Sequence, residues 1–435
     1  MAEIIQPRVL KGFRDILPDA EILRTNLQEK ITQVYRSFGF VPIDTPVLEY
    51  SEILLRKSNG ETEKQVFRFE DNGKRDVAMR FDLTVPFARF TAEHESELYF
   101  PFKRYHLAKV WRGEKPQAGR YREFVQCDID TVGTDSAGAD FEILSVMKAA
   151  LAAIGVTDVT IHVNHRGIFN RFLAKIGQLE KSEDILRSVD KLAKVGESEV
   201  KKELVEFTGS EEAAQEILKY IAGGKDFDST LNLLEEMAGG EGEDTKRMRE
   251  IREMMKASGI EATYVLDPSI TRGLDYYTGI VYETFLNELP SIGSVCSGGR
   301  YDNLAGLYTK TKLPGVGASI GLDRLIAGLE QLGRTEKKGS YLDAEIFCMD
   351  KNLTILYQGV ASKLREKGIA VEVFPEAKKM NQQYAVTDAK GVKWGIIIGS
   401  NEAEKNVATL KNLKTREQFA DLTVDQIADK IIQER

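Results

Sequence analysis

Arg112, Glu114, Arg120 and Phe124 lie around a short turn in residues 110–124. Arg112 and Glu114 end one strand-like run, and Arg120 precedes the next, which begins at Phe124. Guanidinium groups match phosphate oxygens, a carboxylate can accept a hydrogen bond from an adenine amino group, and an aromatic ring offers a stacking face. The segment therefore predicts a hairpin that can hold a nucleotide. A charged hairpin that faces solvent is the alternative interpretation.

A glycine-rich run at residues 315–321 precedes a stretch with helical spacing that contains Arg324. The run has the spacing G-x-G-x-x-x-G, which departs by one residue from the loop that binds dinucleotides, and no β-α-β unit surrounds it. We therefore reject a dinucleotide site and expect the glycines to let the sheet and the helix approach closely. Arg324 would still reach a polyphosphate.

Two segments rich in glycine, tyrosine and charge, residues 271–279 and 296–303, are typical of a small polar pocket. Backbone can approach a ligand at glycine, tyrosines present hydroxyl groups on rigid rings, and Arg272 can meet a carboxylate or a phosphate. The tyrosines concerned are Tyr276, Tyr277 and Tyr301. The alternative is that both segments are turns whose tyrosines fill the core.

Polar side chains also alternate along two apparent strands, residues 80–84 and 126–130. With a period of two, each set shares one face of its strand. The sets are Asp82 and Thr84 in the first strand, and Gln126, Asp128 and Asp130 in the second. Carboxylates on a covered sheet face need cationic or donor partners, which an ammonium group or a protonated imidazole would supply. A sheet surface that faces solvent is the alternative.

A sheet must position these residues, because most of them lie in or beside strand-like runs. Separated by Gly, Asp and Asn clusters, such runs recur at residues 65–69, 76–81, 105–111, 124–132, 280–285 and 315–321. Few helices lie between them, which favours a largely antiparallel sheet.

The N-terminal part predicts a helix followed by an edge strand. Residues 22–38 have the apolar spacing of one helix face, and Gly39 stands where a helix commonly ends on glycine. The next residues, 40–48, are apolar and β-branched but contain Pro42 and Pro46. Proline cannot donate to a sheet ladder, so this segment is expected to be an edge strand or an interface segment.

The rest of the chain divides into a helical segment and a C-terminal domain. Residues 166–262 show helical spacing and helix-capping serines, and they predict a helical insertion. A polar, glycine-flanked linker at residues 333–340 predicts a domain boundary. Beyond it, strand and helix patterns alternate, which favours a small α/β domain with a mostly parallel sheet.

Composition excludes several classes of protein. A chain of 435 residues, 42% hydrophobic, is expected to form two or three domains. The net charge of −8 argues against indiscriminate nucleic-acid binding. No apolar stretch approaches the ~20 residues of a membrane helix, and no leader is recognisable, so we expect a cytoplasmic protein. Three separated cysteines and the pair His162 and His165 form no metal-ligand pattern, and no structural metal is predicted.

In this order, the segments resemble the histidyl-tRNA synthetase family along essentially the whole chain, from Lys11-Gly12-Phe13-Arg14-Asp15 onwards. Arg-Gly-Leu-Asp-Tyr-Tyr from Arg272 and Ser-Gly-Gly-Arg-Tyr-Asp from Ser297 look like the two signature motifs of that family. Pro46, the Arg112 hairpin and Arg324 look like motifs 1, 2 and 3 of class II synthetases. The resemblance implies an α+β protein in which an antiparallel catalytic domain (residues 1–165 and 263–332) carries a helical insertion (166–262) and is followed by an anticodon-binding α/β domain (341–435).

The resemblance also implies an aminoacyl-tRNA ligase that activates L-histidine with ATP to histidyl-adenylate and transfers it to the 3′-hydroxyl of the terminal ribose of tRNA(His). Arg272 and Arg112 would be catalytic. The implied ATP-binding residues are Arg112, Glu114, Arg120, Phe124 and Arg324. The implied histidine-binding residues are Asp82, Thr84, Arg112, Gln126, Asp130, Arg272, Tyr276, Tyr277 and Tyr301.

Further implied features are Mg²⁺ on the ATP phosphates, a homodimer through the Pro46 region, and tRNA contacts from the helical insertion and the C-terminal domain. Two other classes compete with this interpretation. One is a catalytically silent relative that senses histidine for ATP-phosphoribosyltransferase, and the other is a different class II synthetase. The presence of Arg112, Arg272, Arg324 and the terminal domain favours the active enzyme.

Overall fold

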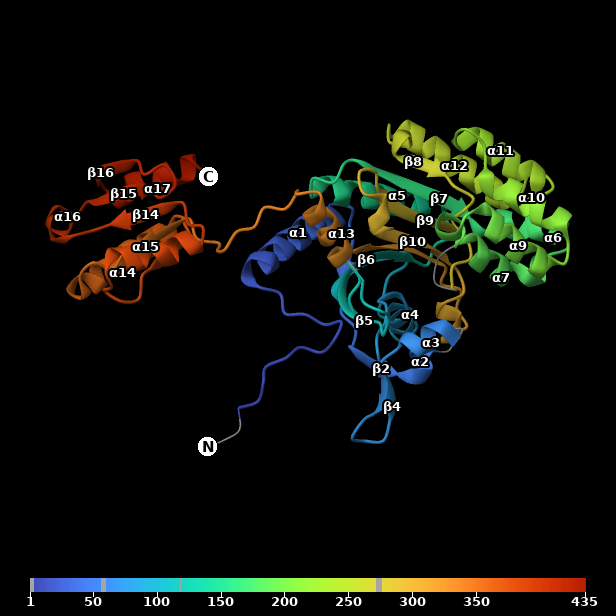
Figure 1. Ribbon diagram of the computed structural model, residues 1–435, viewed down its shortest axis with the longest axis horizontal. Helices are drawn as coiled ribbons and strands as arrows, with labels where there is room; N and C mark the ends of the chain where they lie inside the picture. Colours follow the sequence, from blue (N-terminus) through green and yellow to red (C-terminus); the bar gives the residue numbers. More distant parts are fainter. Residues whose placement is uncertain (1–3, 56–59, 118, 271–275) are drawn as a thin grey trace. The chain divides into compact units, whose positions relative to one another are not determined.

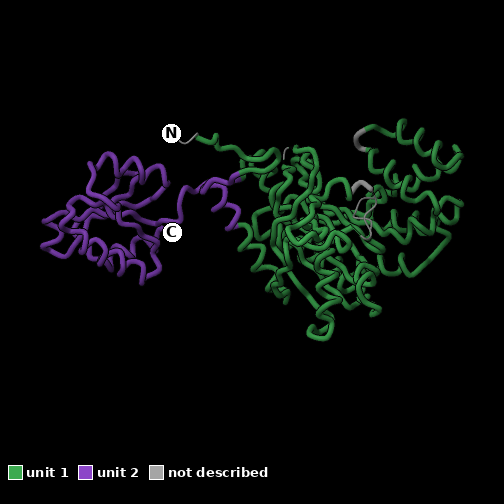
Figure 2. The backbone as a smooth tube through the Cα atoms, turned by 90° about the horizontal axis from the view of Figure 1, so that it is seen from below, with its two compact units in different colours: residues 1–14, 27–334 green, residues 15–26, 335–435 purple. Residues whose placement is uncertain are grey.

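The computed structural model describes residues 4–55, 60–117, 119–270 and 276–435. The chain forms two compact units, which are coloured separately in Figure 2. Unit 1 contains residues 1–14 and 27–334, and unit 2 contains residues 15–26 and 335–435. No helix among the described residues is long and apolar enough to cross a membrane.

Unit 1 is built on an eight-stranded sheet (Figure 1). In spatial order its strands are β1 (Val41–Pro42), β5 (Phe102–Trp111), β6 (Glu123–Val132), β11 (Gly315–Gly321), β10 (Cys296–Tyr301), β9 (Ile280–Leu286), β7 (Val159–His165) and β8 (Tyr264–Leu266). The six central strands pair antiparallel, and only the short edge strands β1 and β8 pair parallel to their neighbours. The predicted antiparallel sheet is confirmed.

Two helices, α5 (Ala137–Ala153) and α13 (Leu322–Gln331), pack against the central strands of this sheet. The side chain of Ser136 caps α5 by accepting the backbone N–H of Gly138, which is the usual role of serine at a helix start. The helix α13 follows β11 directly, so its first turn stands at the end of a central strand. That junction carries Arg324.

The segment with two prolines lies at sheet edges, as predicted. β1 ends at Pro42 at the edge of the large sheet. β2 (Leu48–Tyr50) is the edge strand of a small antiparallel sheet with β4 (Asp76–Met79) and β3 (Arg68–Glu70). The predicted helix before it is α1 (Pro18–Ser37), and Gly39 takes the expected left-handed conformation with φ +83°.

Two sequence predictions in this part of the chain are wrong. Gln65 ends a helix, α3 (Gly60–Gln65), and does not begin a strand. Residues 80–84 do not form a strand either, because the chain leaves β4 after Met79 and enters α4 (Thr84–Glu93). The remaining short helix of this region is α2 (Ser51–Leu55). Alternation of polar and apolar residues over five positions does not distinguish a strand from a strand-to-helix junction.

The chain between β7 and β8 is helical, as predicted. Its elements are α6 (Arg166–Lys175), η1 (Leu179–Lys181), α7 (Ser182–Val189), α8 (Leu192–Val195), α9 (Glu197–Thr208), α10 (Glu211–Ala222), α11 (Phe227–Met237), α12 (Glu243–Ala257) and η2 (Glu261–Thr263). Figure 1 shows them, in green to yellow, gathered beside the β7–β8 end of the sheet. Short 3-10 turns η3 (Pro290–Ile292) and η4 (Ala305–Leu307) complete unit 1.

Unit 2 contains a five-stranded sheet in the order β13 (Val371–Val373), β12 (Ala344–Ile346), β14 (Trp394–Ile397), β15 (Ala408–Asn412) and β16 (Gln418–Leu422). Its helices are η5 (Lys351–Leu353), α14 (Thr354–Glu366), α15 (Met380–Ala389), α16 (Ser400–Lys405) and α17 (Val424–Gln433). Strands β13, β12 and β14 are parallel, but β15 and β16 are antiparallel to their neighbours. The sheet is therefore mixed and not mostly parallel as predicted. The five residues between β15 and β16 are too few for a parallel crossover.

Candidate functional site

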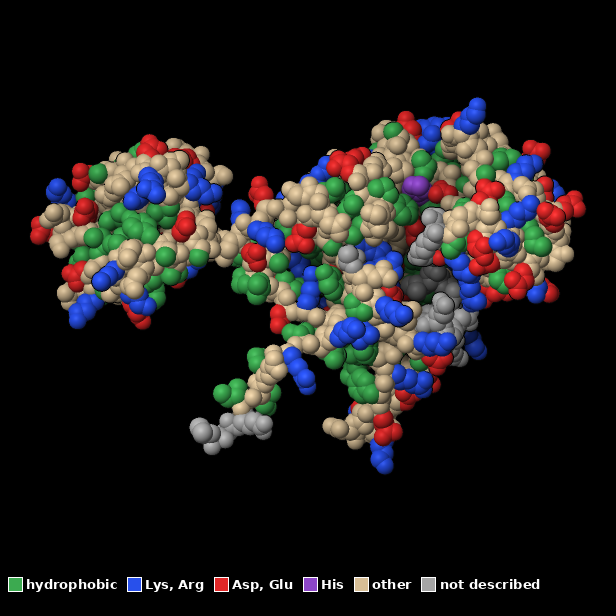
Figure 3. All heavy atoms as spheres, viewed as in Figure 1, with side chains coloured by type: hydrophobic (Ala, Val, Ile, Leu, Met, Phe, Trp, Pro, Cys, Tyr) green, Lys and Arg blue, Asp and Glu red, His purple; other side chains and the backbone are tan. Residues whose placement is uncertain are grey.

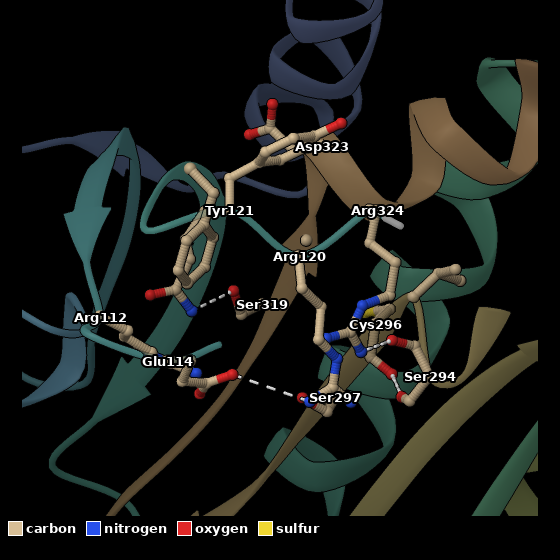
Figure 4. A pocket seen from close by; sticks show the side chains of 15 residues that line it. Arg112, Glu114, Arg120, Tyr121, Ser294, Cys296, Ser297, Ser319, Asp323 and Arg324 are labelled. Atoms are coloured by element: carbon tan, nitrogen blue, oxygen red, sulfur yellow. Dashed lines mark hydrogen bonds and ion pairs between the residues drawn. The ribbon is translucent and has the colours of Figure 1, made fainter. Parts of the chain in front are cut away.

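Two cavities of about 270 and 240 Å³ adjoin each other on the central strands of unit 1. Four residues line both of them: Arg112, Gln126, Ser297 and Ser319. The first cavity, seen in Figure 4, lies between the β5–β6 hairpin and the start of α13. The second lies over β6, β10 and β11, and tyrosines form part of its lining.

The β5–β6 hairpin positions one wall of the first cavity. Arg112 follows β5 directly, and its Nε donates to the carbonyl oxygen of Phe81 at 2.9 Å. Its guanidinium lies 5.2 Å from the centre of the Phe124 ring, so the cation and the aromatic face are already paired. Arg120 reaches across the turn to Glu114, with 3.7 Å between its Nη1 and the carboxylate Oε2. The predicted nucleotide hairpin is thus a real hairpin whose charged groups face a cavity.

Arg324 brings a third guanidinium to this cavity. Its Nη1 donates to the carbonyl oxygen of Ser294 at 2.7 Å, and Figure 4 shows it extending into the cavity beside Arg120. Burial, together with the neighbouring charges of Arg120 and Arg112, lowers the pKa of Arg324 to about 10. A guanidinium whose pKa is lowered by burial and by neighbouring cations is stabilised by an anion placed beside it. The first cavity is therefore suited to a polyphosphate.

The second cavity is lined by carboxyl groups from one strand. Gln126, Asp128 and Asp130 all face it from β6, which confirms that the three share one face. Gln126 Nε2 donates to Ser319 Oγ on the neighbouring strand at 2.8 Å. The prediction that such carboxylates need cationic partners is also confirmed, because Arg104 on β5, which has no exposed side-chain surface, lies 2.6 Å from an oxygen of Asp130.

Asp130 is held at the bottom of this cavity. The hydroxyl of Tyr301 donates to Asp130 Oδ1 at 2.5 Å, and Arg104 Nη2 approaches Oδ2. Burial raises the pKa of Asp130 to about 7 and the pKa of Asp128 to about 6, although Arg104 opposes both shifts. The site therefore carries more buried carboxyl groups than its own arginine neutralises. A ligand that brings positive charge or N–H donors would relieve this.

Asp82 and Thr84 line the same cavity from a different element than the sequence predicts. They lie where the chain enters α4, and Asp82 Oδ1 accepts the backbone N–H of Val85 at 3.2 Å. The hydroxyl of Tyr276 donates to Asp82 Oδ2, also at 3.2 Å. Burial raises the pKa of Asp82, partly offset by the Val85 N–H and by Arg112. The two residues belong to the cavity although they are not part of a strand.

The three tyrosines singled out in the sequence line the second cavity. The Tyr276 ring packs edge-on against Tyr277 and Tyr301, with centroid distances of 4.9 and 5.9 Å. Tyr276 and Tyr301 are almost fully buried, at 7% and 2% exposure. Their hydroxyls donate to the carboxylates of Asp82 and Asp130. The two tyrosines therefore fill the core, as the alternative interpretation has it, and also bind the carboxylates of the cavity. Arg272, predicted to be catalytic, lies outside the described residues.

The glycines of β11 serve a different purpose than the sequence predicts. A Cβ atom on Gly317 would lie 1.9 Å from Asp130 Oδ1, and one on Gly315 would lie 2.3 Å from the Tyr301 ring. These glycines make room for side chains of the adjacent strands β6 and β10. They do not serve the approach of sheet and helix, because the atoms that would clash belong to neighbouring strands.

Several lining residues were missed by reasoning from the sequence. They are Glu283, Ser294, Ser297 and Ser319 in the cavity walls, and Arg104 behind Asp130. Ser297 lies in residues 296–303, which the sequence predicts to form part of a small polar pocket, so its presence in the cavity wall could have been expected. Arg104 faces Asp130 only because the two residues are partners in the β5–β6 register, which no local pattern reveals.

Comparisons with known proteins agree with this geometry. A family model described as histidyl-tRNA synthetase matches residues 12–325, and one described as anticodon binding domain matches residues 343–434. The histidine–tRNA ligase of Treponema denticola is 62% identical over 404 residues, which cover 92% of this chain and 90% of the relative.

Solved structures give the same picture. The histidyl-tRNA synthetase of Nostoc sp. PCC 7120 has a TM-score of 0.89 and 31% identity, with 99% of this chain and all of that chain covered. A Bacillus halodurans protein described as an ATP phosphoribosyltransferase regulatory subunit/histidyl-tRNA synthetase shares the fold, with a TM-score of 0.77 at 22% identity over 92% of this chain and all of that chain. The family match over residues 12–325, with a relative 62% identical over nearly the whole chain, confirms the resemblance read from the sequence: this chain belongs to the histidyl-tRNA synthetase family.

Proposed function

We propose that the two adjoining cavities bind the two small substrates of one ligase reaction, ATP in the first and L-histidine in the second. Membership of the family makes the chain an aminoacyl-tRNA ligase for histidine. The observation that supports the assignment is the contrast between the cavities. Three guanidinium groups converge on the first, and buried carboxyl groups line the second. Arg112 lines both, so it stands where the two substrates would meet.

In the first cavity, Arg112 would bind the α-phosphate of ATP, and Arg120 and Arg324 its distal phosphates. The lowered pKa of Arg324 supports this, because its guanidinium is buried beside two other cations and an anion would stabilise its charged form. The adenine would stack on Phe124 and donate from its amino group to Glu114, both of which line the cavity. Each group is thus matched to a part of the nucleotide with complementary charge.

In the second cavity, Asp82 and Thr84 would bind the α-ammonium group of histidine, and Gln126 its carboxylate. The imidazole would lie between Asp130 and Tyr277, with Tyr276 and Tyr301 as further walls. The raised pKa values of Asp82 and Asp130 support this, because buried carboxyl groups gain from the N–H donors and positive charge of the amino acid. A wrong side chain would not offer Asp130 the N–H donor of an imidazole, at a cost of roughly 1–3 kcal/mol.

The reaction would need no protein nucleophile. The carboxylate of histidine attacks the α-phosphorus of ATP, forming the mixed anhydride histidyl-adenylate, and pyrophosphate leaves. The 3′-hydroxyl of the terminal tRNA ribose then attacks the acyl carbon and releases AMP. Catalysis would consist of positioning and charge stabilisation by Arg112 and by Arg272, the role of which remains a prediction from the sequence.

We also propose that ATP enters with Mg²⁺ on its phosphates. Mg²⁺ is usually held by one or two carboxylates and by substrate phosphates. Glu283 and Arg112 both line the second cavity, so Glu283 would supply a carboxylate to this cation. The cation would neutralise phosphate charge.

The regulatory alternative, a histidine sensor, would require only the second cavity. Three arginines around a separate cavity, one of them with a lowered pKa, would serve no purpose in a protein that binds histidine alone. The shared fold of the Bacillus halodurans protein does not distinguish the two functions. The first cavity therefore favours the active ligase.

For the tRNA, we propose that unit 2 reads the anticodon and that the helical segment between β7 and β8 contacts the acceptor arm. The match of residues 343–434 to an anticodon-binding model supports the first part. On the face seen in Figure 3, acidic and basic side chains are interspersed over the helical segment. Many of them pair, as Lys191 does with Glu203 at 2.9 Å. Contacts there would be local and not a broad basic surface.

We propose a homodimer formed through the region of Pro46. Four apolar residues near it are exposed: Val47, Leu48, Tyr50 and Phe69, at 40–52%. Leu48 and Tyr50 alternate on the edge strand β2, whereas Glu49 between them points inward to Arg89. An edge strand with an apolar outer face is a surface that a second copy would cover.

The first experiment is histidine-dependent exchange of labelled pyrophosphate into ATP, because it tests activation without tRNA. We expect exchange with L-histidine and none with the other standard amino acids. Arg324→Ala serves as the internal comparison, since it should weaken exchange through ATP and leave histidine binding intact. A folded protein that binds histidine but exchanges with no amino acid would contradict the ligase and favour the sensor.

A further inference from the structure

The segment Lys11–Arg14 has no role in the function proposed so far, although its sequence belongs to the motif with which the family resemblance begins. In the structure, the segment lies against the β5–β6 hairpin, which is far from it in sequence. The carbonyl oxygen of Gly12 accepts the backbone N–H of Arg122 at 2.9 Å. Arg122 in turn donates its Nε to the carbonyl oxygen of Glu114 at 3.1 Å. The N-terminal segment thus contacts the hairpin that carries the ATP-binding residues.

Gly12 is required for this close approach. Its φ of +88° is a conformation that favours glycine, and an added Cβ would lie 2.7 Å from the Cδ atom of Arg122. The side chain of the next residue, Phe13, packs edge-on against Phe67 at 6.1 Å between ring centroids. The contact of Gly12 with Arg122 and the contact of Phe13 with Phe67 therefore hold the backbone of the segment in place.

Arg14 connects the two walls of the first cavity. Its guanidinium lies 3.8 Å from the centre of the Tyr121 ring and forms an ion pair with Asp323. Tyr121 comes from the hairpin and Asp323 from the first turn of α13, and both line the cavity (Figure 4). Asp323 also accepts the backbone N–H of Val125 at 2.7 Å, directly after Phe124. Arg14 itself is not a lining residue, so any effect on ATP must pass through Tyr121 and Asp323.

We propose that residues 11–14 form a strap that positions the ATP site, with Arg14 as a positioning residue for Phe124 and Arg324. The proposal rests on the assignment of the first cavity to ATP. Asp323 is buried and directly precedes Arg324, so an ion pair that fixes Asp323 also fixes the start of α13. The stacked guanidinium holds Tyr121 on the opposite wall. Loss of Arg14 would let the two walls separate, whereas the histidine cavity does not contact the strap.

The test is Arg14→Ala, with Lys11→Ala as the matched control. Lys11 lies in the same segment and carries the same charge, but its side chain is exposed, and it contacts Arg122 through its carbonyl oxygen. Pyrophosphate exchange is measured at varied ATP and at varied histidine. We expect Arg14→Ala to raise the KM for ATP about five- to tenfold and to change the KM for histidine less than about twofold. Lys11→Ala should resemble the wild type.

Two further variants separate positioning from general stability. Arg14→Lys keeps the charge near Asp323 but loses the planar stack on Tyr121, so it should restore part of the ATP affinity. Gly12→Ala disturbs the strap through Arg122 and should raise the KM for ATP in the same way. An Arg14→Ala enzyme with unchanged KM for ATP, or with equal increases for ATP and histidine, would overturn the strap.

Failure of the strap and failure of the ligase function are distinguishable. Wild-type protein without histidine-dependent exchange would contradict the ligase but leave the strap testable by calorimetric titration with ATP and Mg²⁺. Weaker ATP binding by Arg14→Ala than by Lys11→Ala would then support the strap, and equal binding would overturn it. Exchange by the wild type together with equal ATP binding by both variants would reject the strap alone.

Discussion

Gly317 shows how one residue shapes the second cavity. It lies opposite Asp130 in the β11–β6 register, and a Cβ atom there would lie 1.9 Å from the carboxylate. The carboxylate cannot yield easily, because Tyr301 and Arg104 hold it from the other sides. The absence of a side chain at this position is thus part of the site.

We expect Gly317→Ala to raise the KM for histidine by about tenfold or more and to leave the KM for ATP nearly unchanged, because Asp130 must move. Pyrophosphate exchange at varied histidine measures this. Gly306→Ala is the control, since an added Cβ there meets nothing within 4 Å. Normal histidine kinetics in Gly317→Ala would mean that Asp130 does not contact the amino acid.

The buried acids Asp128 and Asp130 predict a pH dependence of stability. Their pKa values of about 6 and about 7 lie above the value of about 3.9 for an aspartate in the unfolded chain. Between these values the folded state binds more protons than the unfolded state. The free energy of unfolding therefore falls as pH rises through this window.

We expect the ligand-free protein to lose stability from about pH 4 to about pH 7, and Asp130→Asn to lose less over the same range. Urea unfolding at several pH values measures this. Asp71→Asn is the control: Arg75 lowers the pKa of the partly exposed Asp71, so its contribution to stability is constant above about pH 4. Its replacement should therefore shift the stability curve over this range without changing its slope. Parallel curves for wild type and Asp130→Asn would contradict the buried titration.

At the scale of elements, α5 connects the helical segment to the catalytic sheet through one carboxylate. Asp140 has no exposed surface, and its two oxygens bind different arginines. Arg300 on β10 donates its Nε to Oδ1 at 2.8 Å, and Arg247 on α12 donates its Nε to Oδ2 at 2.6 Å. Arg300 also precedes Tyr301, the partner of Asp130. The position of α12 is thus linked to the strand that lines the histidine cavity.

We expect Asp140→Ala to destabilise the protein by roughly 3–5 kcal/mol, because the buried guanidinium of Arg300 loses its ion pair with the buried Asp140 carboxylate. Arg247→Ala should cost less, since its side chain is partly exposed and Asp140 keeps Arg300. Arg249→Ala on the same helix is the control, as its pair with Glu235 lies within the helical segment. Urea unfolding compares the three, and an Asp140→Ala protein as stable as Arg249→Ala would exclude this link.

At the scale of the whole molecule, β2 forms part of the proposed dimer interface. A charged substitution on β2 should therefore change the oligomeric state. We expect the wild type to sediment as a dimer and Leu48→Glu to sediment as a monomer, because a charge in the interface would be buried without a partner. Ile355→Glu provides the control. Ile355 is 88% exposed and lies on α14 in unit 2, whereas Pro46 belongs to unit 1. A Leu48→Glu dimer, or a wild-type monomer, would reject this interface.

The sequence by itself determined the chemistry available to this protein. Local spacing predicted the hairpin that carries Arg112, the carboxylate face of β6, the helical segment and the antiparallel sheet, because each depends on residues close together in the chain. The motifs around Arg272 and Ser297 were sufficient to indicate the family.

Only the tertiary structure decided how these parts meet. The β5–β6 register places Arg104 beside Asp130, and the strand order brings Gly317 and Tyr301 to the same carboxylate. The wrong predictions of a mostly parallel C-terminal sheet and of β11 glycines that face a helix concerned strand pairing of this kind. The wrong strand predictions at Gln65 and at residues 80–84 arose where a helix ends or begins, which local alternation does not reveal. Register, strand order and the contact of Arg14 with Asp323 join residues far apart in sequence. The free energy that favours these long-range contacts comes from packing and charge pairing in the folded chain. No local pattern of residue types encodes it.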